Sequence, residues 1–124
     1  MMLGDRVFVD TCMVIEYLKG RLELNKQECY INSIVLMELY LGARNKQELY
    51  KLKAKLQGFR LLDITQDEMD LATQIVDMYA LSHGAKIQDA IIASSCLISN
   101  LSLATYNLKD FRYIPDLKLI KDIG

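Results

Sequence analysis

Residues 7–20, VFVDTCMVIEYLKG, decide the fold of this chain. The VFV run at residues 7–9 is rich in β-forming side chains and stops at Asp10. The apolar residues that follow, up to Gly20, recur at the spacing of a helix. The stretch therefore predicts a strand that leads directly into a helix, the alternation from which α/β folds are built.

The rest of the chain continues this alternation. Capping residues and helical periodicity predict further helices over residues 34–41, 45–56, 65–82 and 90–98. Short apolar runs predict strands over residues 60–64 and 101–105, and an edge strand over residues 117–120. The predicted fold class is α/β: a three-layer sandwich in which helices flank a central, mostly parallel sheet.

Length and composition limit the classes of protein that fit. The 124 residues have the size of one domain, and the apolar content of 52% excludes a disordered chain. The formal net charge of −1 creates no global attraction to a polyanion, so any nucleic-acid contact must be local. The three cysteines are widely spaced and odd in number, which favours reduced thiols in the cytoplasm over a disulfide framework. No apolar stretch approaches the ~18 residues of a membrane-spanning helix.

Polar residues follow the ends of two predicted strands. Asp10 follows the first strand, and Asn107 and Asp110 follow a later one. Ligands of open α/β sheets bind beyond the carboxyl ends of the strands, so these residues are expected on one rim. Asp10 is equally well explained as a helix N-cap, and the same explanation fits Asp89, which precedes a predicted helix.

Glu38 stands out because every helical neighbour in the segment IVLMELYL, residues 34–41, is apolar. A carboxylate in such a helix is expected to be partly buried, and it must then be protonated, paired with a base or bound to a metal. The alternative is that Glu38 emerges through a narrow polar strip or meets Arg44.

If Asp10, Glu38 and Asp89 converge, their like charges require a cation. Two carboxylates about 4 Å apart repel by about 4 kcal/mol at an effective dielectric near 20. Oxygen ligands select hard ions, so Mg²⁺ or Mn²⁺ is the expected cofactor, and such ions activate water for phosphodiester hydrolysis. Asn107 or Asp110 would complete the set of ligands.

Four segments resemble, in order, the motifs of the PIN-domain ribonucleases, and within them the VapC-type toxins of toxin-antitoxin pairs. The segments are VFVDTCMVIEYLKG, INSIVLMELYLGA, HGAKIQDAIIASSCLIS and LATYNLKDFRYIPDLKLI. The resemblance covers essentially the whole chain and implies a single PIN-like domain over residues 1–124. It places the acids at Asp10, Glu38 and Asp89, with Thr11 as an adjacent hydroxyl. The fourth acidic position falls on Asn107 or on Asp110.

The resemblance also implies an activity and partners. It implies a cytoplasmic endoribonuclease that depends on Mg²⁺ or Mn²⁺, commonly forms a homodimer and is inhibited by a small antitoxin. The metal ligands would be Asp10, Asp89 and Glu38. Residues that would contact RNA or support the acids lie beside them in the sequence: Thr11, Lys86, Thr105 and Lys109.

Other interpretations stay open. A PIN-like interaction module without catalysis is one, because Asn107 brings no charge. A phosphoacceptor signalling domain with Asp63 as acceptor is another, although the chain lacks an acidic pair near the first strand and a Lys at position 105. Lysines 51, 53 and 55 either line an RNA track or form the solvated face of a helix. His83, without a nucleophile at motif spacing, is expected to lie on the surface near Gly84.

Overall fold

A five-stranded sheet forms the centre of the structure, a computed structural model that describes residues 6–120. The strand order is β3-β2-β1-β4-β5, and every pair of neighbours is parallel. The strands are β1 (Val7–Val9), β2 (Cys29–Asn32), β3 (Arg60–Leu62), β4 (Ser102–Ala104) and β5 (Leu119–Ile120). The predicted central sheet is confirmed, and it is parallel throughout.

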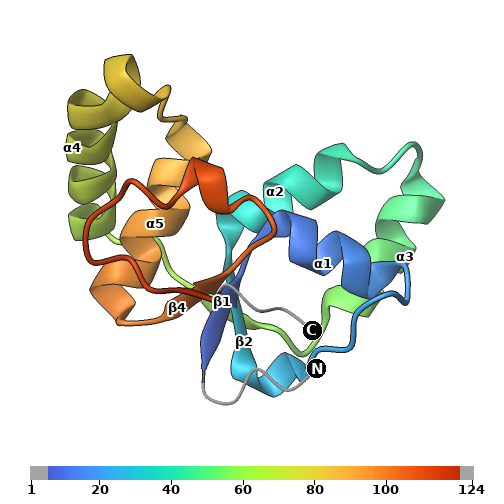
Figure 1. Cartoon of the computed structure of the whole chain (residues 1–124). Helices are drawn as coiled ribbons and strands as arrows, with labels where there is room; N and C mark the ends of the chain where they lie inside the picture. Colours follow the sequence, from blue (N-terminus) through green and yellow to red (C-terminus); the bar gives the residue numbers. More distant parts are fainter. Residues whose placement is uncertain (1–5, 121–124) are drawn as a thin grey trace.

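Helices cover both faces of this sheet (Figure 1). α1 (Thr11–Leu18), α2 (Ser33–Leu41) and α3 (Lys46–Leu56) lie on one side, and α4 (Gln66–His83) and α5 (Ile87–Ser99) lie on the other. Two short 3-10 helices, η1 (Lys26–Glu28) and η2 (Leu108–Asp110), complete the described elements. The predicted three-layer sandwich is therefore confirmed. Among these described helices, none combines the length and the apolar character needed to cross a membrane.

The core lies where helices cover the central strands. Phe8 and Leu103, from β1 and β4, are fully buried, as are Met13 from α1 and Ile92 from α5. A strand covered on both faces needs apolar side chains on both, which explains why residues 7–9 form a continuous apolar run.

Several predicted boundaries are wrong by one or two residues, and one strand was not predicted. The strands predicted over residues 60–64, 101–105 and 117–120 are shorter at their ends. The missed strand is β2, Cys29–Asn32. Its four residues follow the polar segment 25–28, and its last residue, Asn32, has a stronger signal as a helix cap than as a strand residue. The sequence pattern therefore showed only the helix that follows.

The interpretation of Asp89 as a helix cap is wrong. α5 begins at Ile87, the N-cap is Lys86 in an extended conformation, and the Ala90 amide donates to the Lys86 carbonyl. Asp89 consequently lies inside the first helical turn, where its carboxylate is near the positive end of the helix dipole.

The order of the strands sets the place of the site. The chain moves outward from β1 to β2 and β3, then returns past β1 to form β4 on its other side. The strand order therefore reverses between β1 and β4, and crevices at such reversals are where α/β folds bind ligands. Val9 pairs with Ala104, so Asp10 and Thr105 emerge side by side at the carboxyl ends of these two strands.

Candidate active site at the carboxyl ends of β1 and β4

Asp10 is held at this rim by several hydrogen bonds. Its Oδ1 accepts from the Thr11 amide at 2.8 Å, and its Oδ2 accepts from the Thr105 hydroxyl at 2.8 Å. Its own amide donates to the Ala104 carbonyl at 3.0 Å, which extends the β1–β4 pairing by one residue. Asp10 is thus the N-cap of α1, as predicted, and its side chain is only 6% exposed. Asp10 is therefore both the helix cap and a residue of the candidate site.

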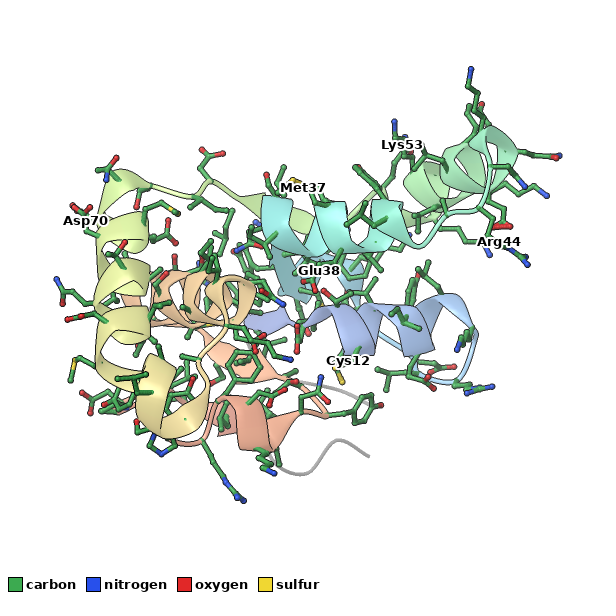
Figure 2. The ribbon with its side chains drawn as sticks, turned by 90° about the horizontal axis from the view of Figure 1, so that it is seen from above. Cys12, Met37, Glu38, Arg44, Lys53 and Asp70 are labelled. Atoms are coloured by element: carbon green, nitrogen blue, oxygen red, sulfur yellow. The ribbon has the colours of Figure 1, made fainter. Side chains whose placement is uncertain are left out.

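Glu38 reaches the same rim from α2. The Thr11 hydroxyl donates to Glu38 Oε1 at 3.0 Å, so a hydrogen bond connects the start of α1 to the middle of α2. Figure 2 shows Glu38 on the side of α2 that faces α1. The carboxylate is partly buried, as predicted from its apolar neighbours.

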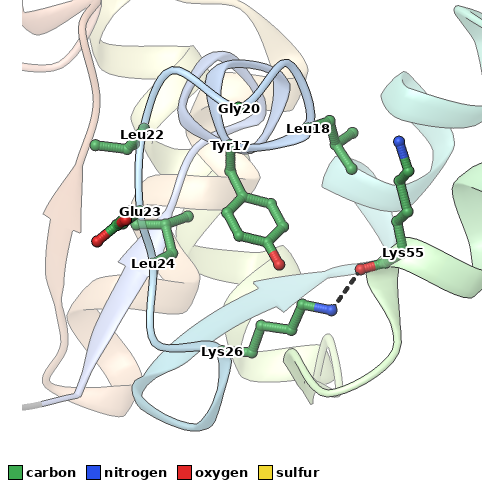
Figure 3. Close-up of a pocket in the computed structure, with 8 residues that line it drawn as sticks. All are labelled: Tyr17, Leu18, Gly20, Leu22, Glu23, Leu24, Lys26 and Lys55. Atoms are coloured by element: carbon green, nitrogen blue, oxygen red, sulfur yellow. Dashed lines mark hydrogen bonds between the residues drawn. The ribbon is translucent and has the colours of Figure 1, made fainter.

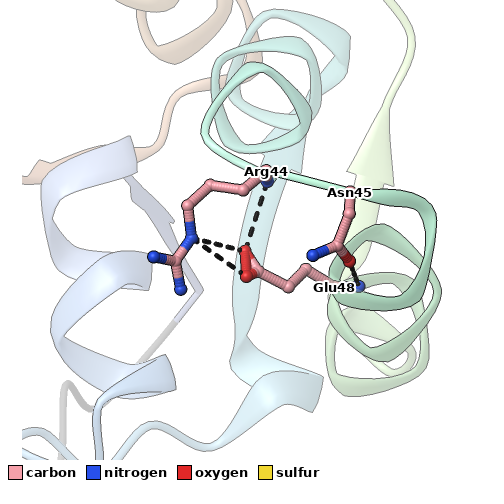
Figure 4. A network of polar contacts seen from close by, with 3 residues as sticks. All are labelled: Arg44, Asn45 and Glu48. Carbon is pink, nitrogen blue, oxygen red and sulfur yellow. Dashed lines mark hydrogen bonds and ion pairs between the residues drawn. The ribbon is translucent and has the colours of Figure 1, made fainter.

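Arg44 is not the partner of Glu38. Its guanidinium Nε contacts both carboxylate oxygens of Glu48 at 3.1 Å, and its amide donates to Glu48 Oε1 (Figure 4). Asn45 caps α3 beside this pair by accepting from the Glu48 amide. The expectation that Arg44 meets Glu38 is therefore wrong, because the i,i+4 partner within its own segment is closer.

Asp89 enters the rim from the first turn of α5. The pKa of Asp89 is raised to about 6, mainly by burial and then by the negative charges of Asp10, Asp110 and Glu38, while the positive charge of Lys86 opposes the rise. These charges act over short range, so their effect locates Asp89 among the other acids. The charges of Asp10, Asp110 and Glu38 thus act on Asp89 from three other segments of the chain.

The pKa of Asp10 is also raised. Burial is the largest cause, Asp110 adds to it, and the hydrogen bonds from Thr105, Thr11 and Cys12 oppose it. A carboxylate that must lose water and face other carboxylates is stabilised in its charged form by a cation. Both acids are therefore in the electrostatic state expected of ligands for a positive ion.

Asn107 and Asp110 have different relations to this cluster. The Asn107 amide donates to Thr105 Oγ1 at 3.0 Å, and its side chain is exposed and makes no capping hydrogen bond. Asp110, at the end of η2, acts electrostatically on both Asp10 and Asp89. The charge of Asp110 therefore reaches both acids, and Asn107 is linked to Asp10 through the Thr105 hydroxyl.

Cys12 belongs to the site although sequence reasoning did not select it. Its thiol donates to Asp10 Oδ2 at 3.7 Å, its sulfur lies 3.6 Å from Thr105 Oγ1, and it accepts from the Tyr106 amide at 3.4 Å. Burial raises the pKa of this thiol, so it stays protonated and acts as a hydrogen-bond donor. The sequence feature that could have identified Cys12 is its position two residues after Asp10, in the first turn of the helix.

The donor set fits a hard divalent cation. All the acids present oxygen ligands, and the thiols of Cys29 and Cys96 are buried elsewhere in the core. Within residues 6–120, no group of three or more His, Cys, Asp or Glu side chains has an arrangement that could hold a metal ion. Like charges repel at short distance, and a divalent cation would offset that repulsion between carboxylate ligands.

Other candidates lie apart from the acids. Asp63 follows the edge strand β3, two strands away from β1, which gives a phosphoacceptor function no support. A cavity of about 610 Å³ lies at the other end of α1, where Lys26 donates to the Lys55 carbonyl, and none of the four acids lines it (Figure 3).

Comparison with known proteins gives a consistent answer. The family model of the PIN domain matches residues 7–117. Ribonuclease VapC of Rickettsia bellii (strain RML369-C) is 30% identical over 126 residues, which covers 92% of this chain and 94% of that protein.

Solved structures agree. A toxin-antitoxin complex from Klebsiella pneumoniae is 26% identical, with a TM-score of 0.74, over 93% of this chain and 96% of that chain. The DNA-bound VapBC structure from Salmonella typhimurium is 25% identical, with a TM-score of 0.76, over 94% and 97%. The chain therefore belongs to the PIN-domain family and, within it, to the VapC ribonucleases.

Proposed function

We propose that this protein is an endoribonuclease, the toxin of a toxin-antitoxin pair, that hydrolyses RNA phosphodiesters and depends on Mg²⁺ or Mn²⁺. The observation that supports the proposal is the buried Asp10 at the carboxyl end of β1, which is linked to Glu38 through Thr11 and, like Asp89, has a pKa raised by burial and by the charge of Asp110. Its membership of the VapC ribonucleases supports the reaction type.

The chain's own residues have distinct roles in this proposal. Asp10 and Asp89 are the main metal ligands, because both carboxylates are partly desolvated and gain most from a cation. Glu38 is a further ligand or orients the attacking water, since its Oε1 is held by Thr11. Asp110 completes the acidic set, with Asn107 beside it. The bound ion supplies charge stabilisation for the phosphodiester and lowers the pKa of water.

Thr105 and Cys12 are positioning residues. They donate to the same oxygen of Asp10, so the carboxylate cannot rotate freely away from the rim. Lys86 and Lys109 are exposed beside the acids and are proposed to contact phosphates of the substrate.

The partners follow from the same assignment. We expect RNA as substrate, a small antitoxin as inhibitor, assembly as a homodimer and a cytoplasmic location. The related structures from Klebsiella pneumoniae and Salmonella typhimurium are a toxin-antitoxin complex and a DNA-bound VapBC, which supports the antitoxin as partner. Light scattering on the purified protein, alone and with its antitoxin, tests the assembly states.

A cleavage assay tests the reaction. The purified protein is incubated with a panel of structured and single-stranded RNAs in Mg²⁺, Mn²⁺ or chelator. The variants are Asp10→Asn and Asp89→Asn, with Asp63→Asn as the matched control because Asp63 is exposed and follows β3, two strands away from β1. We expect cleavage by the wild type and by the control, and loss of cleavage in chelator and in both site variants. Cleavage that persists in chelator or in both site variants contradicts the mechanism.

A further inference from the structure

A groove lies between the end of α4 and the segment around η2. Its volume is about 530 Å³, and it is lined by Ser82, His83, Lys109, Asp110, Arg112 and Tyr113. Asp110 is the one acid among the lining residues, and it lies in η2, whose N-cap residue Asn107 donates to Thr105, the residue that holds Asp10. This α4–η2 groove therefore adjoins the candidate active site at one end.

Two cations of the groove are free to bind an anion. Lys109 and Arg112 are both exposed, and within residues 6–120 neither side chain forms an ion pair or a hydrogen bond. Arg44 and Arg21, in contrast, already contact carboxylates. Lysine and arginine side chains without a carboxylate partner are the usual contacts of phosphate groups.

The groove also contains a fixed aromatic platform. The His83 imidazole stacks on the Tyr113 ring at 4.4 Å between centroids and at 15°, and Tyr79 packs against Tyr113 at 5.1 Å. The Ser82 hydroxyl lies 2.8 Å from His83 Nδ1 and restrains the imidazole further. An exposed ring that is held by a second ring is suited to stack on a flat ligand.

We propose that the α4–η2 groove binds one nucleotide of the RNA strand next to the cleaved bond, with Lys109 and Arg112 on its phosphate and His83 stacked on its base. The proposal deepens the proposed function, because it assigns the path of the substrate from the acidic cluster toward α4. It also explains why a protein with a net charge of −1 retains an unpaired basic pair beside its acids.

The chemistry of the groove favours RNA over an acidic peptide. Both ligands would satisfy the two cations, but only a nucleotide offers an anion and a flat ring one sugar apart. His83 and Tyr113 would have no ligand to stack on in a complex with aspartate or glutamate side chains.

The first experiment measures binding without cleavage. A 12-nucleotide single-stranded RNA of randomised sequence, labelled with fluorescein, is titrated with the full chain in chelator, and anisotropy gives the affinity. The variant Lys109→Gln/Arg112→Gln is compared with Lys19→Gln/Lys46→Gln, which removes the same charge from exposed positions at the end of α1 and the start of α3. Thermal unfolding confirms that both variants are folded.

Loss of two phosphate contacts has a defined signature. Each single-strand contact contributes a slope of about −0.7 in log affinity against log salt, so the groove variant should lose about 1.4 from this slope and roughly 25-fold in affinity at 0.1 M salt. The Lys19→Gln/Lys46→Gln variant should retain the wild-type slope. An unchanged slope in the groove variant, or an equal loss in both variants, overturns the proposal.

The second experiment tests the stacking platform. His83→Ala should weaken RNA binding by about tenfold, and His83→Phe should restore it, because a phenyl ring keeps the stacking surface without the imidazole nitrogens. Equal affinities for the two variants and the wild type overturn the assignment of His83. The alternative ligand is tested with a 12-residue polyglutamate as competitor. The groove would be a peptide site instead if this peptide displaces the RNA, if Lys109→Gln/Arg112→Gln weakens peptide binding as much as RNA binding, and if His83→Ala changes neither affinity.

These measurements are independent of the cleavage assay. Binding in chelator does not require the acids to act, so the groove assignment stands or fails even if no RNA in the panel is cut. Conversely, cleavage that depends on Asp10 and metal, together with unchanged binding in the groove variants, would leave the proposed function intact and reject the groove.

Discussion

The Thr105 hydroxyl donates a 2.8 Å hydrogen bond to Oδ2 of Asp10, across 95 residues of sequence. Both residues are almost fully buried, and the same hydroxyl accepts from the Asn107 amide. One side chain therefore connects the acid after β1 to the segment that carries Asp110.

Replacement of Thr105 by Val should separate this hydrogen bond from packing. Thr105→Val keeps the shape but removes the donor to a buried carboxylate, so we expect a loss of about 1–3 kcal/mol in the free energy of unfolding. We also expect weaker Mn²⁺ binding, because Asp10 is no longer held in place. Urea unfolding and Mn²⁺ titration by calorimetry measure the two effects. Thr105→Ser retains the hydroxyl and should behave like the wild type in Mn²⁺ titration; equal Mn²⁺ affinities in Val and Ser variants would argue against the positioning role.

Replacement of Asp89 by Asn should stabilise the metal-free protein at neutral pH. The folded pKa of Asp89 is about 6, above its ordinary value of 3.8, so the folded state binds more protons than the unfolded state between these pH values. Stability of the wild type should therefore fall as pH rises from about 4 to 6, and the Asn variant should escape this loss. With allowance for solvent screening, the gain at pH 7 is about 1–2 kcal/mol.

Urea unfolding at pH 4 and pH 7, without metal, measures this difference. At pH 4 the gain should nearly disappear, because Asp89 is then protonated in the folded state. Asp63→Asn, at an exposed position, should change stability by less than about 0.5 kcal/mol at either pH. A destabilised Asp89→Asn variant at pH 7 would show that the carboxylate is not strained by its surroundings.

Metal binding should reverse this pH dependence. A cation competes with protons for Asp89 and Asp10, both of which have raised pKa values, so Mn²⁺ should bind more tightly at pH 7 than at pH 5. The thermal midpoint with saturating Mn²⁺ should rise above the metal-free midpoint at pH 7, and by much less at pH 5. A shift of the same size at both pH values would place the ion away from these acids.

The cap of α2 should matter more than the cap of α3. Asn32 is fully buried, accepts from the amides of Ile34 and Val35 and donates to Ser95 Oγ at 3.2 Å, so it fixes the helix that carries Glu38. Asn32→Ala should cost about 2–3 kcal/mol, since it removes the cap and leaves Ser95 without this donor. Asn45→Ala, at the exposed cap of α3, should cost only about 1 kcal/mol. Chemical denaturation of both variants provides the comparison, and equal losses would contradict it.

Local signals predicted most of the fold. The Thr65–Glu68 capping box and the left-handed Gly84 start and end α4 as predicted, because capping depends on residues close in sequence. β2 was missed because four residues without alternation carry little signal of their own, and its strand conformation depends on pairing with β1 and β3.

The candidate site was predictable in its residue types and less so in its contacts. Glu38 could be selected because a carboxylate in an apolar helix needs a partner. The contacts of Cys12 with Thr105 and Tyr106 could not be foreseen, because they exist only where β4 lies beside β1. The approach of Lys109 and Arg112 to His83 likewise depends on how η2 packs against the end of α4.

The central place of β1 in the sheet has a consequence for synthesis. The ribosome makes β1 first. Its neighbour β4 and Thr105, whose hydroxyl donates to Asp10, are translated about 95 residues later. At translation speeds of about 5–20 residues per second, each nascent chain spends roughly 5–20 s with its first acid exposed and its catalytic rim unbuilt. During that interval the growing polypeptide lacks the hydroxyl that fixes Asp10, so the proposed site is complete only once nearly the whole chain has been made.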